Sequence, residues 1–163
     1  MPNTLNERGF TLVELMIIVA LLAIVATIAV PNFTQFIRNN QVQAKADELT
    51  ALVQYARSQA VAARKTYELD LERWEVKAAG DSSYERKVEF NTGQASTNHN
   101  LGAGKVVSFT GHGMANPAAK ISVCRAGDKD TGYLIDISAS GMVKRYSRGY
   151  KDDSNKMSSC TSF

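Results

Sequence analysis

Glu14 is the only charged residue in the apolar run of residues 10–30. A run of this length can span a bilayer as a helix, for which about 20 residues suffice. An unpaired carboxylate in such a nonpolar medium costs several kcal/mol, or it takes up a proton. We therefore expect Glu14 to pair with a positive charge, and we expect that pairing to explain much of what the chain does.

The polar segment of residues 1–9 ends in Gly9, directly before the apolar run. An ordinary secretory signal carries its small cleavage-site residue after the apolar stretch. Cleavage after Gly9 would instead keep the whole run as a permanent anchor, and it would create a free amine on Phe10. This amine is the nearest positive charge available to Glu14. It belongs either to the same chain, one helical turn away, or to a neighbouring subunit.

The two cysteines, Cys124 and Cys160, are the other residues with reactive chemistry. A bilayer anchor ahead of them indicates an exported domain, where a disulfide can form and persist. Cys160 lies in a polar tail that offers it little burial, which favours the bond over two free, buried thiols. The bond would attach residues 152–162 to a strand, and closing this loop would contribute about 3–4 kcal/mol on the chain-entropy estimate.

One long helix is expected to carry Glu14. Beyond Pro31 the apolar residues recur at three- and four-residue spacing, which predicts an amphipathic helix with one face to bury: Phe33, Phe36, Ile37, Leu49, Leu52, Val53 and Ala56. Pro31 either ends the apolar helix or kinks a helix that continues, because it lacks an N–H donor. We favour a single helix over residues 10–64 with a kink at Pro31.

After the helix, the apolar period changes from that of a helix to that of a strand. Tyr67, Leu69 and Leu71 alternate with acidic residues, as in a half-buried strand. Further strands are expected at residues 74–76, 86–90, 106–110, 120–124, 132–137 and 142–146. Residues 127–131 and 138–141 are predicted turns, and residues 91–104 a long exposed loop. The expected fold class is α+β, with the helix packed on an antiparallel sheet.

Several kinds of chemistry are not expected. The net charge of +3 is too small to indicate nucleic-acid binding without a clustered patch. His99 and His112 fall in predicted loops without partners at metal-ligand spacing. No nucleophile with a matching base and no phosphate-binding glycine loop is found. The sequence thus predicts a protein that is not an enzyme and that uses no cofactor and no metal.

The segment RGFTLVE at residues 8–14 resembles the processing site of type IV prepilins, and the apolar run with Pro31 resembles the same family. The resemblance implies that a membrane prepilin peptidase removes the leader, residues 1–9, by cleaving between Gly9 and Phe10, and that it N-methylates Phe10. It also implies that residues 10–30 first lie in the inner membrane and later form the core of a filament. Pairing of Glu14 with the Phe10 amine of a neighbouring subunit is the alternative it favours.

Residues 46–62, the segment GYLI at 132–135 and the segment SGMVK at 140–144 resemble the GspH/FimT family of minor pilins. This implies a pilin fold in which residues 31–64 form the amphipathic half of the long helix and residues 65–163 form a β-rich periplasmic domain. Among the family, FimU-like minor pilins are the best match. The implied function is a subunit that helps to initiate assembly near the pilus tip, with other minor pilins, the major pilin and the inner-membrane assembly platform as partners.

Two alternatives within the family stay open. The first is minor pseudopilin H of a type II secretion system, against which the C-terminal disulfide argues. The second is a FimT-like minor pilin that binds DNA. The Gly-Arg-x-Arg motif of FimT is altered here to GMVK at residues 141–144, but a basic cluster follows, with Tyr146 and Tyr150 between its members: Lys144, Arg145, Arg148 and Lys151. Basic groups with interleaved aromatics can bind a nucleic-acid backbone. We favour a solvated, charged edge strand instead.

Overall fold

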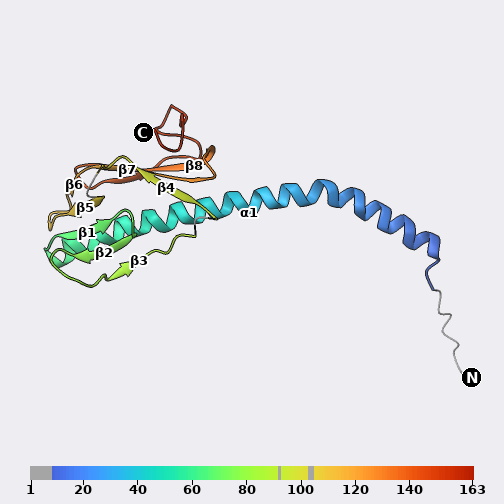
Figure 1. Ribbon diagram of the computed structural model, residues 1–163, viewed down its shortest axis with the longest axis horizontal. Helices are drawn as coiled ribbons and strands as arrows, with labels where there is room; N and C mark the ends of the chain where they lie inside the picture. The colour runs from blue at the N-terminus through green and yellow to red at the C-terminus, as the bar shows by residue number, and fades with distance from the viewer. Residues whose placement is uncertain (1–8, 92, 103–104) are drawn as a thin grey trace, which may run out of the picture. The chain divides into compact units, whose positions relative to one another are not determined.

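The computed structural model describes residues 9–91, 93–102 and 105–163, and the chain divides into two compact units, Met1–Ile37 and Arg38–Phe163. Residues 1–8 of the predicted leader lie outside the described residues. One helix, α1 (Leu12–Ala63), runs through the boundary between the units (Figure 1). This is the long helix that the sequence predicts, shortened by two residues at its start and one at its end.

Pro31 lies inside α1 and does not end it. The missing N–H of Pro31 leaves the Thr27 carbonyl without its usual helical donor. Two neighbouring side chains add hydrogen bonds to the backbone here: Asn32 Nδ2 donates to the Ile28 carbonyl at 3.0 Å, and Thr34 Oγ1 donates to the Val30 carbonyl at 2.9 Å. The helix therefore continues through the proline, while the kink itself stays a prediction.

The second part of α1 buries one face, as its amphipathic pattern predicts. The buried positions follow a spacing of three and four residues: Val42, Ala46, Leu49, Leu52, Val53, Ala56 and Ala60. Burial begins only at Val42. Phe33 and Phe36, which the pattern assigns to the same face, are 64% and 60% exposed in the unit Met1–Ile37.

Two antiparallel sheets complete the unit Arg38–Phe163, where the sequence predicts one. The first has the order β3-β2-β1-β5-β6. Its strands are β1 (Tyr67–Asp70), β2 (Glu75–Ala78), β3 (Arg86–Lys87), β5 (Val106–Phe109) and β6 (Ala115–Asn116). The second has the order β4-β7-β8-β9, with β4 (Ser96–His99), β7 (Ala119–Arg125), β8 (Asp128–Ile137) and β9 (Val143–Arg145).

The predicted loop at residues 91–104 is wrong over its middle part. Residues 96–99 form β4, which pairs with β7 so that Ser96 lies opposite Cys124 and His99 opposite Ile121. The strand has no apolar alternation because all four of its residues are polar and half-buried. Residues 92, 103 and 104 of the same predicted loop lie outside the described residues.

The predicted turn at residues 127–131 is also wrong, because β8 already begins at Asp128. Ala126 and Gly127 make the turn, both with positive φ (48° and 77°), as a tight two-residue hairpin requires. Trp74, predicted in a strand, precedes β2 with φ 55°. It is nonetheless a core residue, being 4% exposed with its ring centroid 5.5 Å from that of Phe90.

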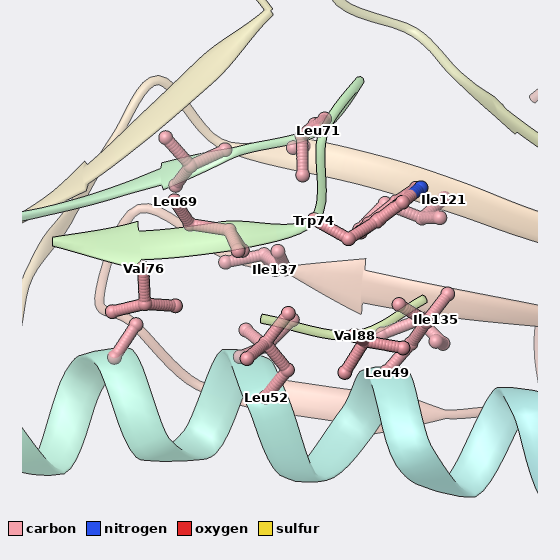
Figure 2. Packing of buried hydrophobic residues seen from close by; sticks show 14 of the residues in the cluster. Leu49, Leu52, Leu69, Leu71, Trp74, Val76, Val88, Ile121, Ile135 and Ile137 are labelled. Carbon is pink, nitrogen blue, oxygen red and sulfur yellow. The ribbon is translucent and has the colours of Figure 1, made fainter. Parts of the chain in front are cut away.

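The core lies between α1 and the sheets. Leu49 and Leu52 point from the helix toward residues of both sheets, among them Val76 of β2 and Ile135 and Ile137 of β8 (Figure 2). All five side chains are fully buried. A long helix packed on antiparallel sheets confirms the α+β class.

Candidate functional site

Thr11 and Glu14 form a capping box at the start of α1. The Glu14 carboxylate accepts hydrogen bonds from the Thr11 backbone N–H at 2.9 Å and from the Thr11 hydroxyl at 2.8 Å. In return, the Glu14 N–H donates to Thr11 Oγ1 at 3.2 Å. Reciprocal bonds of this kind satisfy donors that the first helical turn otherwise leaves unpaired. Thr11 is therefore the N-cap residue of the helix, which explains why α1 begins at Leu12.

The capping role of Thr11 was missed from the sequence, although a Thr-x-x-Glu signal lies at the start of the apolar run. The box holds the Glu14 carboxylate at the N-terminal end of the helix, where a negative charge is favourable. Phe10 is the residue directly before Thr11. A positive charge placed on Phe10 would thus arise beside a carboxylate that is already oriented.

The large apolar side chains of residues 10–37 are exposed in the unit Met1–Ile37. Their exposed fractions run from 42% at Ile37 to 83% at Phe10. By length and composition, α1 is the one helix among the described residues that could cross a membrane. A surface of this kind needs a nonpolar environment, either lipid or the helices of other subunits.

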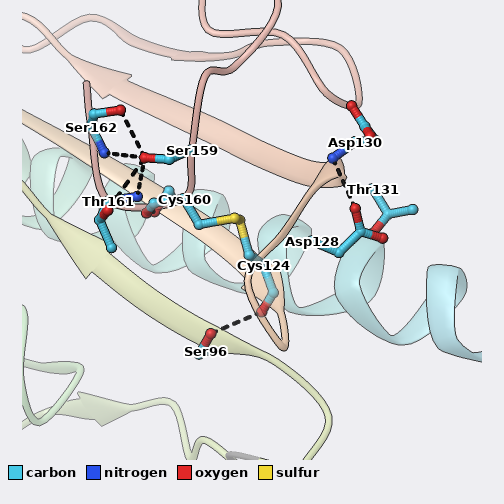
Figure 3. Close-up of a disulfide and its surroundings, with 10 residues drawn as sticks. Ser96, Cys124, Asp128, Asp130, Thr131, Ser159, Cys160, Thr161 and Ser162 are labelled. Atoms are coloured by element: carbon cyan, nitrogen blue, oxygen red, sulfur yellow. Dashed lines mark hydrogen bonds between the residues drawn. A yellow bond between two sulfur atoms is a disulfide. The ribbon is translucent and has the colours of Figure 1, made fainter.

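A disulfide joins Cys124 of β7 to Cys160, as the sequence predicts (Figure 3). Cys160 and Met157 are buried with Cys124 in a small apolar cluster. The Ser122 hydroxyl donates to the Cys160 carbonyl at 2.5 Å. The tail is therefore held on β7 by a covalent bond, a hydrogen bond and apolar contact together.

Asp152 shapes the turn that leads into this tail. Its carboxylate accepts hydrogen bonds from the Ser154 and Asn155 backbone N–H groups and from Asn155 Nδ2. The Ser154 N–H, followed by the two bonds from Asn155, lowers the pKa of Asp152 below its ordinary value. The turn is thus built around an ionised carboxylate.

The basic cluster of the C-terminal part is engaged within the chain. Lys144 donates to both Asp153 oxygens, at 2.8 and 2.6 Å, and this hydrogen bond raises the pKa of Lys144. Arg145 pairs with Asp47 of α1 at 3.2 Å. Lys144 therefore stays protonated and bound to Asp153 within the chain. The charge of Arg145 is likewise balanced, by Asp47.

The remaining two members of the cluster lie after β9. Arg148 Nε donates to the Tyr133 hydroxyl at 3.2 Å, and Arg145 stacks over the Tyr133 ring at 4.9 Å from its centroid. Lys151 makes no ion pair within the described part of the chain. This arrangement supports the interpretation of a charged edge strand over that of a DNA-binding surface.

Two family models match the chain. Residues 4–30 match the model described as the prokaryotic N-terminal methylation motif. Residues 45–141 match the model described as type II transport protein GspH, and so cover most of α1 after its apolar half and most of the strands.

Curated relatives match over a short segment. The type IV major pilin protein PilA of Myxococcus xanthus is 56% identical over 41 residues, which is 24% of this chain and 19% of that protein. A fimbrial protein of Pseudomonas aeruginosa is 42% identical over 52 residues, or 32% of this chain and 34% of that protein. The chain thus covers a fifth to a third of the length of these relatives.

The crystal structure of the type IV minor pilin FimU from Pseudomonas aeruginosa resembles this fold much more completely. The two are 27% identical with a TM-score of 0.62, over 77% of this chain and 98% of that chain. The similarity therefore includes the globular part and extends beyond the apolar helix.

Proposed function

We propose that this chain is a minor pilin of the type IV pilus. The chain belongs to the GspH family of type IV pilin-like proteins. The observation that carries the proposal is the likeness to FimU, which is described as a type IV minor pilin. The chain is a structural subunit with an apolar helix and a globular head, and its mechanism is assembly.

Processing creates the assembly site in this proposal. A membrane prepilin peptidase cleaves between Gly9 and Phe10 and N-methylates Phe10. The new amine then neutralises Glu14, preferably of a neighbouring subunit. A lateral slip of one helix along another would leave a charge unpaired in an apolar bundle, so the pair sets the register between subunits.

Initiation of assembly near the pilus tip is the finer part of the proposal. The major pilins match this chain over its N-terminal segment, while its head matches GspH. A subunit with the shared helix and a different head can enter the bundle but presents other surfaces to its neighbours. Other minor pilins, the major pilin and the inner-membrane assembly platform are its proposed partners, and the head is periplasmic before incorporation.

Minor pseudopilin H is the second candidate, favoured by the name of the matched family model. The disulfide between Cys124 and Cys160 supports a pilus subunit instead, since it resembles the stapled C-terminal region of pilins. DNA binding has less support, because Lys144 forms an ion pair with Asp153 and Arg145 forms one with Asp47.

Glu14→Ala tests the assembly role in cells that produce the full chain. Leader removal, followed by mass spectrometry, should proceed normally. The amount of the chain in sheared filaments should fall at least tenfold, because an unpaired amine is left in the bundle. Normal incorporation of the variant would contradict the proposal.

Glu14→Gln is the matched control. The glutamine keeps an acceptor oxygen for Thr11 but carries no charge, so it preserves part of the capping box and removes the ion pair. Incorporation should fall as far as in Glu14→Ala if the charge matters. Recovery in Glu14→Gln would assign the effect to helix capping alone. Loss of type II secretion in cells with either Glu14 variant, while their pili stay intact, would favour the pseudopilin alternative.

A further inference from the structure

A groove beside the end of α1 is lined by two exposed apolar side chains of the globular unit. Among the described residues of Arg38–Phe163, four large hydrophobic side chains are exposed: Val61 (48%), Tyr84 (55%), Met114 (54%) and Met142 (58%). Val61 and Met142 line the groove, whose volume is about 610 Å³. Two of the four exposed side chains are thus in one groove.

The walls of this groove are held rigidly. The turn at Gly113 comes from the first sheet and the turn at Gly141 from the second, and both glycines have positive φ (77° and 76°). A Cβ on Gly141 would overlap the Gly113 carbonyl, so the two turns are in direct contact. Arg57 Nε of α1 donates to the same carbonyl at 3.1 Å. The groove is therefore formed before any partner arrives.

The charge that lines the groove is positive. Arg57 is the charged residue among its lining residues, and none of these is acidic. Neither Arg57, Arg64 nor the exposed Lys65 has a carboxylate within 4.0 Å among the residues that the structure describes. Lys144 and Arg145 of β9, in contrast, are both paired. The cations at the end of α1 are thus available to an outside anion.

We propose that this groove binds an acidic, apolar segment of another pilin-like subunit, a proposal that rests on the proposed function. Methionine side chains adapt to a partner surface, and both Met and Arg are enriched at protein interfaces. Arg57 supplies donors for a carboxylate, which guanidinium groups bind with matching geometry. Met142 and Val61 offer nothing to a sugar-phosphate backbone, so a protein partner fits better than a nucleic acid.

Site-specific photo-crosslinking in cells that produce the full chain tests this proposal. A photoreactive residue at Val61, which lines the groove, should crosslink to a different pilin-like subunit, identified by mass spectrometry. The same residue at Tyr84 is the control, because Tyr84 is comparably exposed (55% against 48% for Val61) and does not line the groove. Tyr84 should give no product with that subunit.

Two oppositely charged variants at Met142 then test the sign of the partner's charge. Both Met142→Glu and Met142→Lys remove the apolar contact, and the position is exposed, so both variants should fold with Trp74 fluorescence unchanged. Like charges opposed across an interface are strongly unfavourable. The Val61 crosslink should therefore be about tenfold weaker in Met142→Glu than in Met142→Lys, which corresponds to about 1.4 kcal/mol.

Equal yields in the two variants, the reverse order, or a crosslink only to a second copy of this chain or to nucleic acid would overturn the groove proposal. Incorporation into filaments is scored in the same cells. A chain that enters filaments without a charge-dependent Val61 crosslink overturns the groove and leaves the proposed function standing. A charge-dependent crosslink to a pilin-like subunit without incorporation supports the groove and overturns the proposed function.

Discussion

At the scale of single residues, the Glu14 carboxylate has one partner in the structure and a second partner in the proposed function. In the uncleaved chain it is bonded to Thr11, which caps the helix. After the proposed cleavage, a positive charge on Phe10 joins the same end of the helix. The capping box does not compete with the ion pair, since a carboxylate can accept several hydrogen bonds with its two oxygens. It keeps the carboxylate in place for the amine.

Thr11→Ala should loosen the first turn of α1. An N-cap replaced by alanine costs about 1 kcal/mol, so the amide hydrogens of Glu14 and Leu15, which donate to Thr11, should exchange roughly fivefold faster. The measurement is hydrogen exchange on the full chain in detergent micelles. Thr11→Ser keeps a hydroxyl acceptor and should exchange like the parent. Equal exchange in the alanine and serine variants would show that the hydroxyl contributes nothing.

Asp152 predicts a loss of stability in acid. Its pKa is lowered in the folded chain from an ordinary value of 3.8. The carboxylate therefore stabilises the fold fully above pH 3.8, and this contribution is lost as the pH falls through the lower, folded pKa. In Asp152→Asn, the free energy of unfolding should decline less steeply below pH 3.8. The check is denaturant unfolding at a series of pH values; identical slopes in both proteins would contradict the prediction.

At the scale of elements, the disulfide determines whether the C-terminal tail belongs to the fold. The bond links residues 36 positions apart. Replacing both cysteines by alanine should lower the free energy of unfolding by about 3–4 kcal/mol on the chain-entropy estimate. Trp74, the single tryptophan of the chain and a buried one, reports unfolding by its fluorescence. The matched control is Ser158→Ala, an exposed change in the same tail, which should leave stability within about 0.5 kcal/mol.

The elements also show what could be predicted from the sequence. The long helix, the pattern of its buried face from Leu49 to Ala56 and the strands at Tyr67 and Val106 carry strong apolar periodicity. β4 and β6 have no such signal: β4 is entirely polar, and β6 is only Ala115–Asn116. Their pairing is set by backbone hydrogen bonds to β7 and β5. The division of the strands into two sheets likewise depends on contacts between residues that are distant in the sequence.

The candidate site was predictable from the sequence only where its signal is local. A charge in an apolar run and a glycine before it are visible in the sequence without a fold. The partners of Lys144 and Arg145 are not, because Asp47 lies on α1, almost a hundred residues away from β9. Opposite charges come together only through packing of the helix on the second sheet.

At the scale of the whole molecule, the globular unit contains its own core. No described residue before Val42 is buried. We expect residues 38–163 to fold without detergent, with a free energy of unfolding within about 0.5 kcal/mol of that of the full chain. A fragment of residues 48–163 is the matched control. It lacks the buried Val42 and Ala46, and it should be less stable by roughly 2–5 kcal/mol. Trp74 fluorescence in denaturant measures both; equal stability of the two fragments would contradict the prediction.

The bond from β7 to Cys160 also has a mechanical consequence for a chain under tension. The two cysteines lie 36 positions apart. If the fold yields to a force applied outside this segment, the residues between the cysteines cannot extend while the bond is intact. At about 3.4 Å per residue, they hold back roughly 120 Å of contour length. A stretched subunit therefore lengthens by roughly a fifth less than its sequence would allow.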